Sequence, residues 1–286
     1  MKASVSSYSY SQYLRDGRLT LEQLPAKAAE MGFCAIEYID LPQGGTAERE
    51  ANARRIRAAA DEAGMPICAY TVGASLYRPD PADAQAELDR LKGELEIAAI
   101  LGAPLMRHDV CYTIDPAVRS FGRMLPNIAE NVRRITEYAA TLGIRTCSEN
   151  HGFIAQDSYR MEQLFNTVAH ENYGLLVDIG NFMCADEDPA AAVSRVAPYA
   201  IHVHAKDFYL RSFEEGSSTG FFETRGGRFL CGASLGDGVV PVARCLRILE
   251  KAGYDGYASI EYEGRYDCIE GIARGLAYLR ENTSVK

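Results

Sequence analysis

Residues 144–149 have the sequence IRTCSE, a short apolar run that follows Gly143 and ends in the carboxylate of Glu149. The run is rich in residues that favour strands and is too short for a helix. Three further runs in the second half of the chain have the same character: Tyr173 to Asp178, Ala200 to Lys206 and Tyr257 to Glu261. Together they predict buried parallel strands with ionisable groups at their carboxyl ends.

The order of elements around these runs repeats along the chain. An amphipathic helical pattern ends in a glycine, which supplies the left-handed conformation of a helix cap, and an apolar run follows at once. The order is visible at Gly32 before FCAIEYI, Gly64 before MPICAYTV and Gly102 before APLMRHDV, and it recurs at Gly143 and Gly253.

Including a run from Val5 to Tyr10, the chain has eight candidate strands, and no two are close enough in sequence to form a hairpin. Alternation of strands with helices requires parallel pairing through crossover helices. The length of 286 residues matches the roughly 250 residues of an α/β barrel. The sequence therefore predicts one domain over residues 1–286, an α/β protein with the (β/α)8 TIM-barrel fold.

Composition and charge exclude several classes of protein. Hydrophobic residues make up 47% and charged residues 24% of the chain, and no window has the apolar length of a membrane span. The first ten residues, MKASVSSYSY, lack the apolar region of a secretory signal, so we expect a cytoplasmic protein. The net charge of −9, without a clustered Lys/Arg face, argues against nucleic-acid binding and favours a small neutral or metal-chelated substrate.

The eight cysteines include no C-x-x-C pair, and several fall inside apolar segments. We expect them to be small buried thiols in a reducing compartment, not disulfides or a zinc site.

One connection is longer than the others. The stretch from about 207 to 240 contains many aromatic residues, together with Arg225 and Arg228. A long loop after a barrel strand is usually functional, so we expect it on the catalytic face.

Four strand-end residues form the predicted metal site: Glu149, Asp178, His204 and Glu261. Side chains alternate along a strand, so each would share a face with an inward apolar residue and lie at the barrel mouth. Three carboxylates and one imidazole suit Mn²⁺, Mg²⁺ or Co²⁺. A single strand-end carboxylate such as Asp178 is more often a helix cap, and only the set of four favours a metal.

Glu149 and Glu261 are the candidate catalytic pair. Two carboxylates beside a chelating metal suit removal and return of a proton at a carbon next to a carbonyl.

Six more residues are candidates for substrate binding: His151, His202, Lys206, Arg225, His108 and Glu37. Each has a structural alternative. His202 can be a satisfied core or supporting group, Lys206 a salt bridge at the rim, and His108 part of a salt-bridged surface turn.

At these positions the chain resembles the xylose isomerase-like TIM barrel superfamily, in particular its sugar phosphate isomerase/epimerase branch. The matching segments are SENHG at 148–152, VDIGN at 177–181, HVHAKD at 202–207, and LGDG with GYDGYASIEYEG at 235–264. The resemblance implies a Mn²⁺-type metal held by Glu149, Asp178, His204 and Glu261, with the two glutamates as acid/base groups.

The same superfamily includes epimerases, isomerases, dehydratases and endonuclease IV. The last uses a larger, histidine-rich cluster, whereas this chain has five histidines and is acidic. AKDFYLRSF (205–213) and TRGGRFLCGASLGDGVVPV (224–242) also resemble a subgroup that acts on 3-keto sugars and their glycosides. An arginine is expected in that subgroup where Cys231 stands, and Arg225 or Arg228 would have to replace it.

The leading hypothesis is a divalent-metal-dependent isomerase or epimerase that acts on a ketose or 3-keto-glycoside through an enediolate. The second is a metal-dependent lyase, such as a C- or O-glycoside deglycosidase subunit, in which the same base starts an elimination that His151 would assist. A third is a non-catalytic sugar-binding subunit. A homo-oligomer or a small partner subunit fits any of the three.

Overall fold

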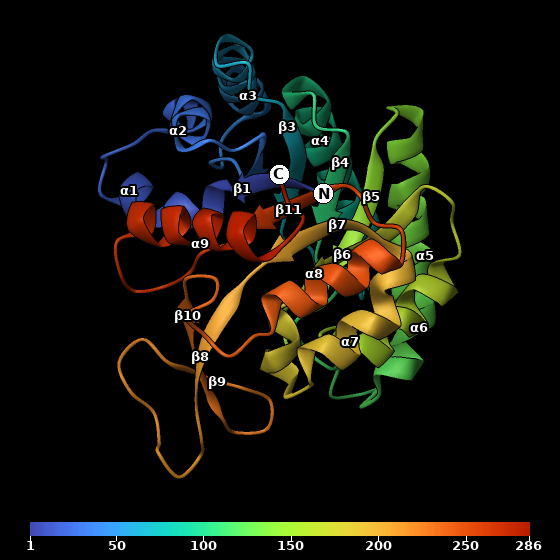
Figure 1. The fold of residues 1–286 in the computed structure, drawn as a ribbon. Coiled ribbons are helices and arrows are strands. Elements are labelled where there is room, and N and C mark those ends of the chain that lie inside the picture. The colour runs from blue at the N-terminus through green and yellow to red at the C-terminus, as the bar shows by residue number, and fades with distance from the viewer.

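A closed barrel of eight parallel strands forms the centre of the computed structural model, which describes residues 1–286 (Figure 1). Around the barrel the strands follow the order β1-β11-β7-β6-β5-β4-β3-β2. Their bounds are β1 Lys2–Ser6, β2 Ala35–Ile39, β3 Ile67–Val72, β4 Leu105–His108, β5 Arg145–Glu149, β6 Tyr173–Asp178, β7 Ala200–Ala205 and β11 Tyr257–Ile260. The predicted (β/α)8 barrel is confirmed.

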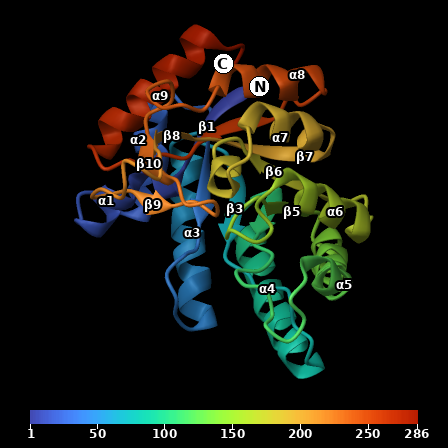
Figure 2. The same ribbon diagram turned by 90° about the horizontal axis from the view of Figure 1, so that it is seen from below.

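Nine α-helices accompany the strands and lie around the barrel (Figure 2). They are α1 Ser11–Arg15, α2 Leu24–Met31, α3 Thr46–Glu62, α4 Pro81–Leu101, α5 Phe121–Thr141, α6 Ser158–Val168, α7 Pro189–Val196, α8 Val242–Lys251 and α9 Cys268–Asn282. Short 3-10 helices are η1 Ser7–Tyr10, η2 Leu21–Gln23, η3 Asn181–Ala185 and η4 Ala197–Tyr199. Gly32 and Gly102 end α2 and α4 in the left-handed conformation, as expected. None of the helices combines the length and apolarity needed to cross a membrane.

The barrel interior has an apolar layer beneath a polar one. Ala69, Leu105, Cys147 and Leu176 pack together on four neighbouring strands. Two residues further along each strand, on the same face, stand Thr71, Arg107, Glu149 and Asp178, all buried. The apolar layer closes the barrel, and the polar layer faces its carboxyl end. All eight cysteines are free thiols, and only Cys34 is exposed.

Two features of the chain differ from the sequence prediction. The first strand covers Lys2–Ser6, and the chain then turns into η1 because the Ser6 hydroxyl accepts a hydrogen bond from the Tyr8 amide. The stretch 207–240 is not one loop. It contains a three-stranded antiparallel sheet of β8 Asp207–Arg211, β10 Phe229–Ala233 and β9 Phe222–Glu223, which extends away from the barrel in Figure 1.

Asp207 holds this excursion to the barrel. Its carboxylate accepts hydrogen bonds from the amides of Phe208 (2.8 Å), Gly236 (2.9 Å), Gly238 (3.0 Å) and Val240 (2.9 Å). A Cβ on Gly238 would lie 2.2 Å from Asp207 Oδ1, so only glycine permits this close approach.

Replacing Asp207 by alanine would leave four backbone donors without their acceptor, and each unsatisfied buried group costs about 1–3 kcal/mol. We expect Asp207→Ala to lower the free energy of unfolding by roughly 2–4 kcal/mol, because water can reach some of these amides. Urea denaturation would measure the change. Exposed Glu62→Ala should change stability by less than about 0.5 kcal/mol, and an equal effect of both variants would contradict the anchoring role.

Candidate metal centre

The four predicted metal ligands meet at the carboxyl end of four neighbouring strands. Glu149 ends β5, Asp178 ends β6, His204 lies in β7 and Glu261 follows β11. All four are buried, and one ligand atom from each lies within 4.8 Å of the others. Asp178 and His204 are direct register partners, and the Glu261 amide donates to the carbonyl of Ala205 at 3.0 Å. Strand pairing therefore fixes the relative heights of the four side chains.

His204 directs one ring nitrogen at the three carboxylates. Its Nδ1 lies 3.5 Å from Glu149 Oε1, 3.6 Å from Glu261 Oε1 and 3.9 Å from Asp178 Oδ2. His204 Nδ1 and Asp178 Oδ2 are both buried without a hydrogen-bond partner. Buried polar atoms are rarely left unsatisfied, and a cation between these atoms would satisfy both. The donor set of three carboxylates and one imidazole fits a divalent metal with a preference for oxygen ligands.

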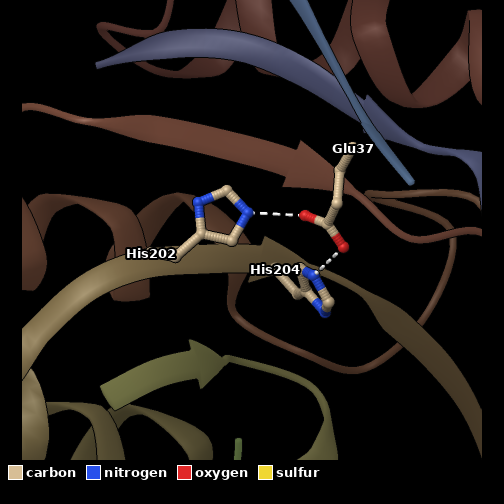
Figure 3. Close-up of side chains that lie close together, drawn as sticks. All are labelled: Glu37, His202 and His204. Atoms are coloured by element: carbon tan, nitrogen blue, oxygen red, sulfur yellow. Dashed lines mark hydrogen bonds and ion pairs between the residues drawn. The ribbon is translucent and has the colours of Figure 1, made fainter. Parts of the chain in front are cut away.

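Glu37 supports His204 from across the barrel. Its carboxylate binds His202 Nε2 at 2.5 Å through Oε2 and His204 Nε2 at 2.8 Å through Oε1, and Figure 3 shows it between the two rings. Thr71 donates a third hydrogen bond at 2.9 Å. Burial would raise the pKa of Glu37, but the two histidines lower it well below its usual value. A charged Glu37 accepts a hydrogen bond from the Nε2–H group of His204, which leaves Nδ1 as the candidate ligand atom.

Arg107 was not predicted from sequence and is buried beside Glu149. Its Nη2 lies 2.5 Å from Glu149 Oε2 and 2.8 Å from Asp109 Oδ1. Asn181 donates to Glu149 Oε1 at 3.0 Å. Burial would raise the pKa of Glu149, but Arg107 and then His204 hold it well below the usual range, so this carboxylate stays ionised.

Lys206 extends from β7 into the other side of the site. Its Nζ lies 2.5 Å from Glu261 Oε2, 3.3 Å from Asp178 Oδ2 and 3.5 Å from Glu263 Oε2. Burial would lower the pKa of Lys206, but Asp178 and Glu261 raise it well above its usual value. The ammonium ion thus compensates part of the buried negative charge. Glu263 is the second residue of this site that the sequence analysis missed.

A cavity of about 220 Å³ opens over these side chains, and we call it the metal-site cavity. Glu149, Glu261, Arg107, Lys206 and His151 are among its lining residues. Its volume lies below the roughly 300–1,000 Å³ of pockets for drug-sized ligands, so it suits a small polar molecule such as one sugar ring.

Of the six predicted substrate-binding residues, two line the cavity. These are Lys206 and His151, and His151 Nδ1 lies 2.8 Å from Asp109 Oδ1. Burial would lower the pKa of His151, but its hydrogen bond to Asp109 raises it above the usual value.

The other four predicted substrate-binding residues lie away from the cavity. Glu37 and His202 are buried in their mutual hydrogen bond beneath His204. His108 has the opposite strand parity from Arg107, so it is buried beside Tyr173, with a ring-centroid distance of 6.4 Å, and is not in a surface turn. Arg225 binds Asp157 at 2.9 Å on the loop before α6.

Replacing Glu37 by glutamine should weaken metal binding. A carboxylate can accept from both imidazoles, whereas an amide offers one oxygen acceptor and places an N–H group against the other ring. We expect the dissociation constant for Mn²⁺ to rise roughly 10- to 100-fold, measured by calorimetry or by electron paramagnetic resonance of free Mn²⁺.

Glu94→Gln is the matched control, because Glu94 is equally buried but binds Arg49 and Tyr70 outside the metal site. It should leave the Mn²⁺ affinity unchanged. Equal affinities of Glu37→Gln and the unmodified protein would contradict a supporting role for Glu37.

Metal affinity should also decrease as the pH is lowered. Burial raises the pKa of Asp178 to about 6, despite the opposing charge of Lys206. Below that pH Asp178 is protonated and neutral, so protons compete with the metal, and above it the carboxylate is free to bind. We expect the dissociation constant for Mn²⁺ to rise about tenfold per pH unit below pH 6. Titrations from pH 5 to 8, with circular dichroism as the check on folding, would measure this, and a constant affinity would contradict it.

Comparison with known proteins gives matches over most of the chain. The rhizopine catabolism protein MocC of Rhizobium meliloti is 26% identical over 260 residues, which cover 86% of this chain and 76% of MocC. The inosose dehydratase of Clostridium perfringens strain 13 is 22% identical over 162 residues, and the match spans only about half of each protein, 55% and 54%.

Solved structures with the same fold include D-psicose 3-epimerase from Clostridium cellulolyticum H10, with a TM-score of 0.75, 16% identity and 99% coverage of both chains. The 3-keto-D-glucoside 4-epimerase YcjR of E. coli has a TM-score of 0.73 and 16% identity, and covers 98% of this chain and 99% of its own. A Mycobacterium smegmatis barrel protein in complex with magnesium also has a TM-score of 0.73, with 17% identity and coverage of 98% and 95%. At such identities these similarities establish the fold.

The model of one protein family matches residues 25–282, from α2 to the end of α9. Together with the closed barrel and the ionisable groups at its strand ends, this match identifies the chain as a member of the xylose isomerase-like TIM barrel family.

Proposed function

We propose that this protein is a divalent-metal-dependent isomerase or epimerase that acts on a ketose or 3-keto-glycoside. The observation that carries this proposal is the pair of glutamates, Glu149 and Glu261, on either side of His204 Nδ1 at the floor of a small polar cavity. The names of similar proteins support it: an inosose dehydratase among the relatives in sequence, and two sugar epimerases among the similar structures.

Glu149, Asp178, His204 and Glu261 would hold the metal, with Mn²⁺ first and Mg²⁺ or Co²⁺ as alternatives. Bound there, a divalent ion would polarise a substrate carbonyl and stabilise the negative charge of an enediolate.

The two glutamates would divide the proton transfer. One glutamate, as the carboxylate, would remove the proton from the carbon next to the carbonyl, and the other, as the carboxylic acid, would return a proton to the enediolate. Arg107 keeps Glu149 charged, and Lys206 contacts Glu261, so each carboxylate has its own cationic partner. Lys206 and His151 reach the cavity and would bind substrate oxygens.

The structure favours an unphosphorylated substrate. The amides of Gly236 and Gly238, which could cradle a phosphate, already bind the carboxylate of Asp207. Arg107 and Lys206 are paired with carboxylates inside the metal-site cavity, and further carboxylates line it. A phosphate dianion would therefore find no free cationic side chain there.

A metal-dependent lyase or dehydratase is the second candidate. The same proton removal would begin it, and the resulting enolate would expel a hydroxyl or glycosidic group. His151 favours this possibility, because its hydrogen bond to Asp109 raises its pKa and it faces the cavity as a proton donor. Loss of water or of an aglycone, with no epimer formed, would identify this reaction.

Replacing Glu261 by glutamine should remove one acid/base group while keeping its shape. We expect Glu261→Gln, and likewise Glu149→Gln, to slow deuterium incorporation next to the carbonyl by roughly 10²- to 10⁴-fold. Proton NMR of Mn²⁺-loaded protein in D₂O, with a panel of ketoses and 3-keto-glycosides, would measure it. Each variant needs a measured Mn²⁺ occupancy, so that lost metal is not mistaken for lost proton transfer.

Exposed Glu223→Gln, in β9 of the excursion, is the control and should retain the exchange rate. Full exchange by metal-loaded Glu261→Gln would refute its acid/base role.

A further inference from the structure

A second cavity, of about 600 Å³, adjoins the metal-site cavity, and we call it the side chamber. Tyr8, Ile39 and Asp40 line both cavities, so these residues lie between the two spaces. The side chamber lies between the segment from η1 to η2 and the loop after β2, which both follow the carboxyl ends of barrel strands. It therefore opens on the same face of the barrel as the metal site.

Part of the lining of the side chamber is apolar, beside the hydroxyl groups of Ser7, Ser11 and Thr20. It includes Leu14, Leu19, Leu21 and Pro42. The three leucines are half-buried and pack against the main core on one side, while the chamber lies on their other side. No lysine or arginine lines the chamber. Such a wall favours an uncharged apolar group over water or an anion.

The junction between the two cavities is polar and conformationally strained. Asp40 has a φ of 28°, which side-chain-bearing residues rarely adopt, and its amide donates to Thr71 O at 2.9 Å. Its Oδ1 accepts from the Gly73 amide at 3.2 Å. Residues held in such conformations cluster at ligand-binding sites.

Gly73 leaves room for a ligand beside Asp40. A Cβ at Gly73 would lie 3.4 Å from Tyr112 Oη, 3.9 Å from Asp109 Oδ2 and 4.0 Å from Asp40 Oδ2. Three oxygens thus surround a point that carries no side chain, and the Tyr112 hydroxyl donates to Asp109 Oδ2 within this group. Hydroxyl groups of a sugar are suitable donors and acceptors for such a cluster.

We propose that the protein takes a two-part substrate, a keto sugar whose ring occupies the metal-site cavity and whose apolar substituent, an aryl or alkyl aglycone, occupies the side chamber. This inference rests on the proposed function, because the metal centre is what binds the sugar. Tyr8 and Asp40 lie where the two parts join. A phosphate substituent would meet the carboxylate of Asp40 and no cation in the chamber.

The test compares phenyl β-D-glucopyranoside with methyl β-D-glucopyranoside as ligands of the Mn²⁺-loaded full chain, by isothermal titration calorimetry. The unmodified protein should bind the phenyl glycoside at least about tenfold more tightly, as expected for an apolar group in a hydrophobic pocket. Leu19→Trp fills the side chamber and should abolish this preference while changing the affinity for the methyl glycoside less than about twofold.

Pro42→Trp, at an exposed rim position, is a second blocking variant in case Leu19→Trp folds poorly. Val239→Trp, also exposed but outside both cavities, should retain the preference. Equal affinities of the two glycosides for the unmodified protein would overturn the proposal. A phenyl preference that survives both blocking variants would overturn the location.

Deuterium exchange separates this proposal from the proposed function. If small ketoses undergo exchange but the phenyl group gives no advantage, the side chamber is not a substrate site and the isomerase proposal stands. If no sugar in the panel exchanges or binds, both proposals fail.

Discussion

The burial of several carboxylates at one end of the barrel is the constraint on which the site depends. Glu37, Glu149, Asp178 and Glu261 are all buried within one small region, and isolated buried charges are strongly unfavourable. The chain compensates them in three ways. Arg107 pairs with Glu149, Lys206 pairs with Glu261 and Asp178, and the two histidines bind Glu37. Asp178 Oδ2 and His204 Nδ1 still lack a hydrogen-bond partner, and they lie 3.9 Å from each other.

The alternation of side chains between the two faces of each strand makes this concentration of charge possible. On β3 to β6, the residue two positions before each polar side chain belongs to the apolar layer, so the same face of a strand changes from core to site within one pleat. The apolar layer excludes water from below, and the polar layer stays rigid because each side chain is fixed by its strand and by its partners. A site preorganised in this way needs little rearrangement to bind a cation.

The sequence was sufficient to predict the barrel and the clustering of Glu149, Asp178, His204 and Glu261, because parallel strands end at one edge and each of these residues ends or follows an apolar run. It was insufficient where a shift of one residue along a strand decides whether a side chain faces the site. His108 was the expected pocket residue, but the side chain that faces the cavity is Arg107. Arg107 lies two residues after Leu105, which belongs to the inner apolar layer, so this alternation could have indicated it. The role of Glu37 depends on contact with His204, 167 residues away in sequence. The antiparallel excursion was missed because its pairing, Leu230 with Leu210, spans a polar, glycine-containing segment.

On the proposed function, chemistry and substrate choice would be carried by different parts of the molecule. The charged groups lie at strand ends, where register and mutual pairing restrict every position. Apart from Ile39 at the end of β2, the residues that line the side chamber lie in the segments after β1 and β2, which contribute none of the four candidate metal ligands. Substitutions of the uncharged residues in these segments could therefore change the volume and polarity of the chamber without altering the charge balance of the candidate metal centre. A barrel arranged in this way can keep one proton-transfer site while the loops select the substituent that accompanies the sugar.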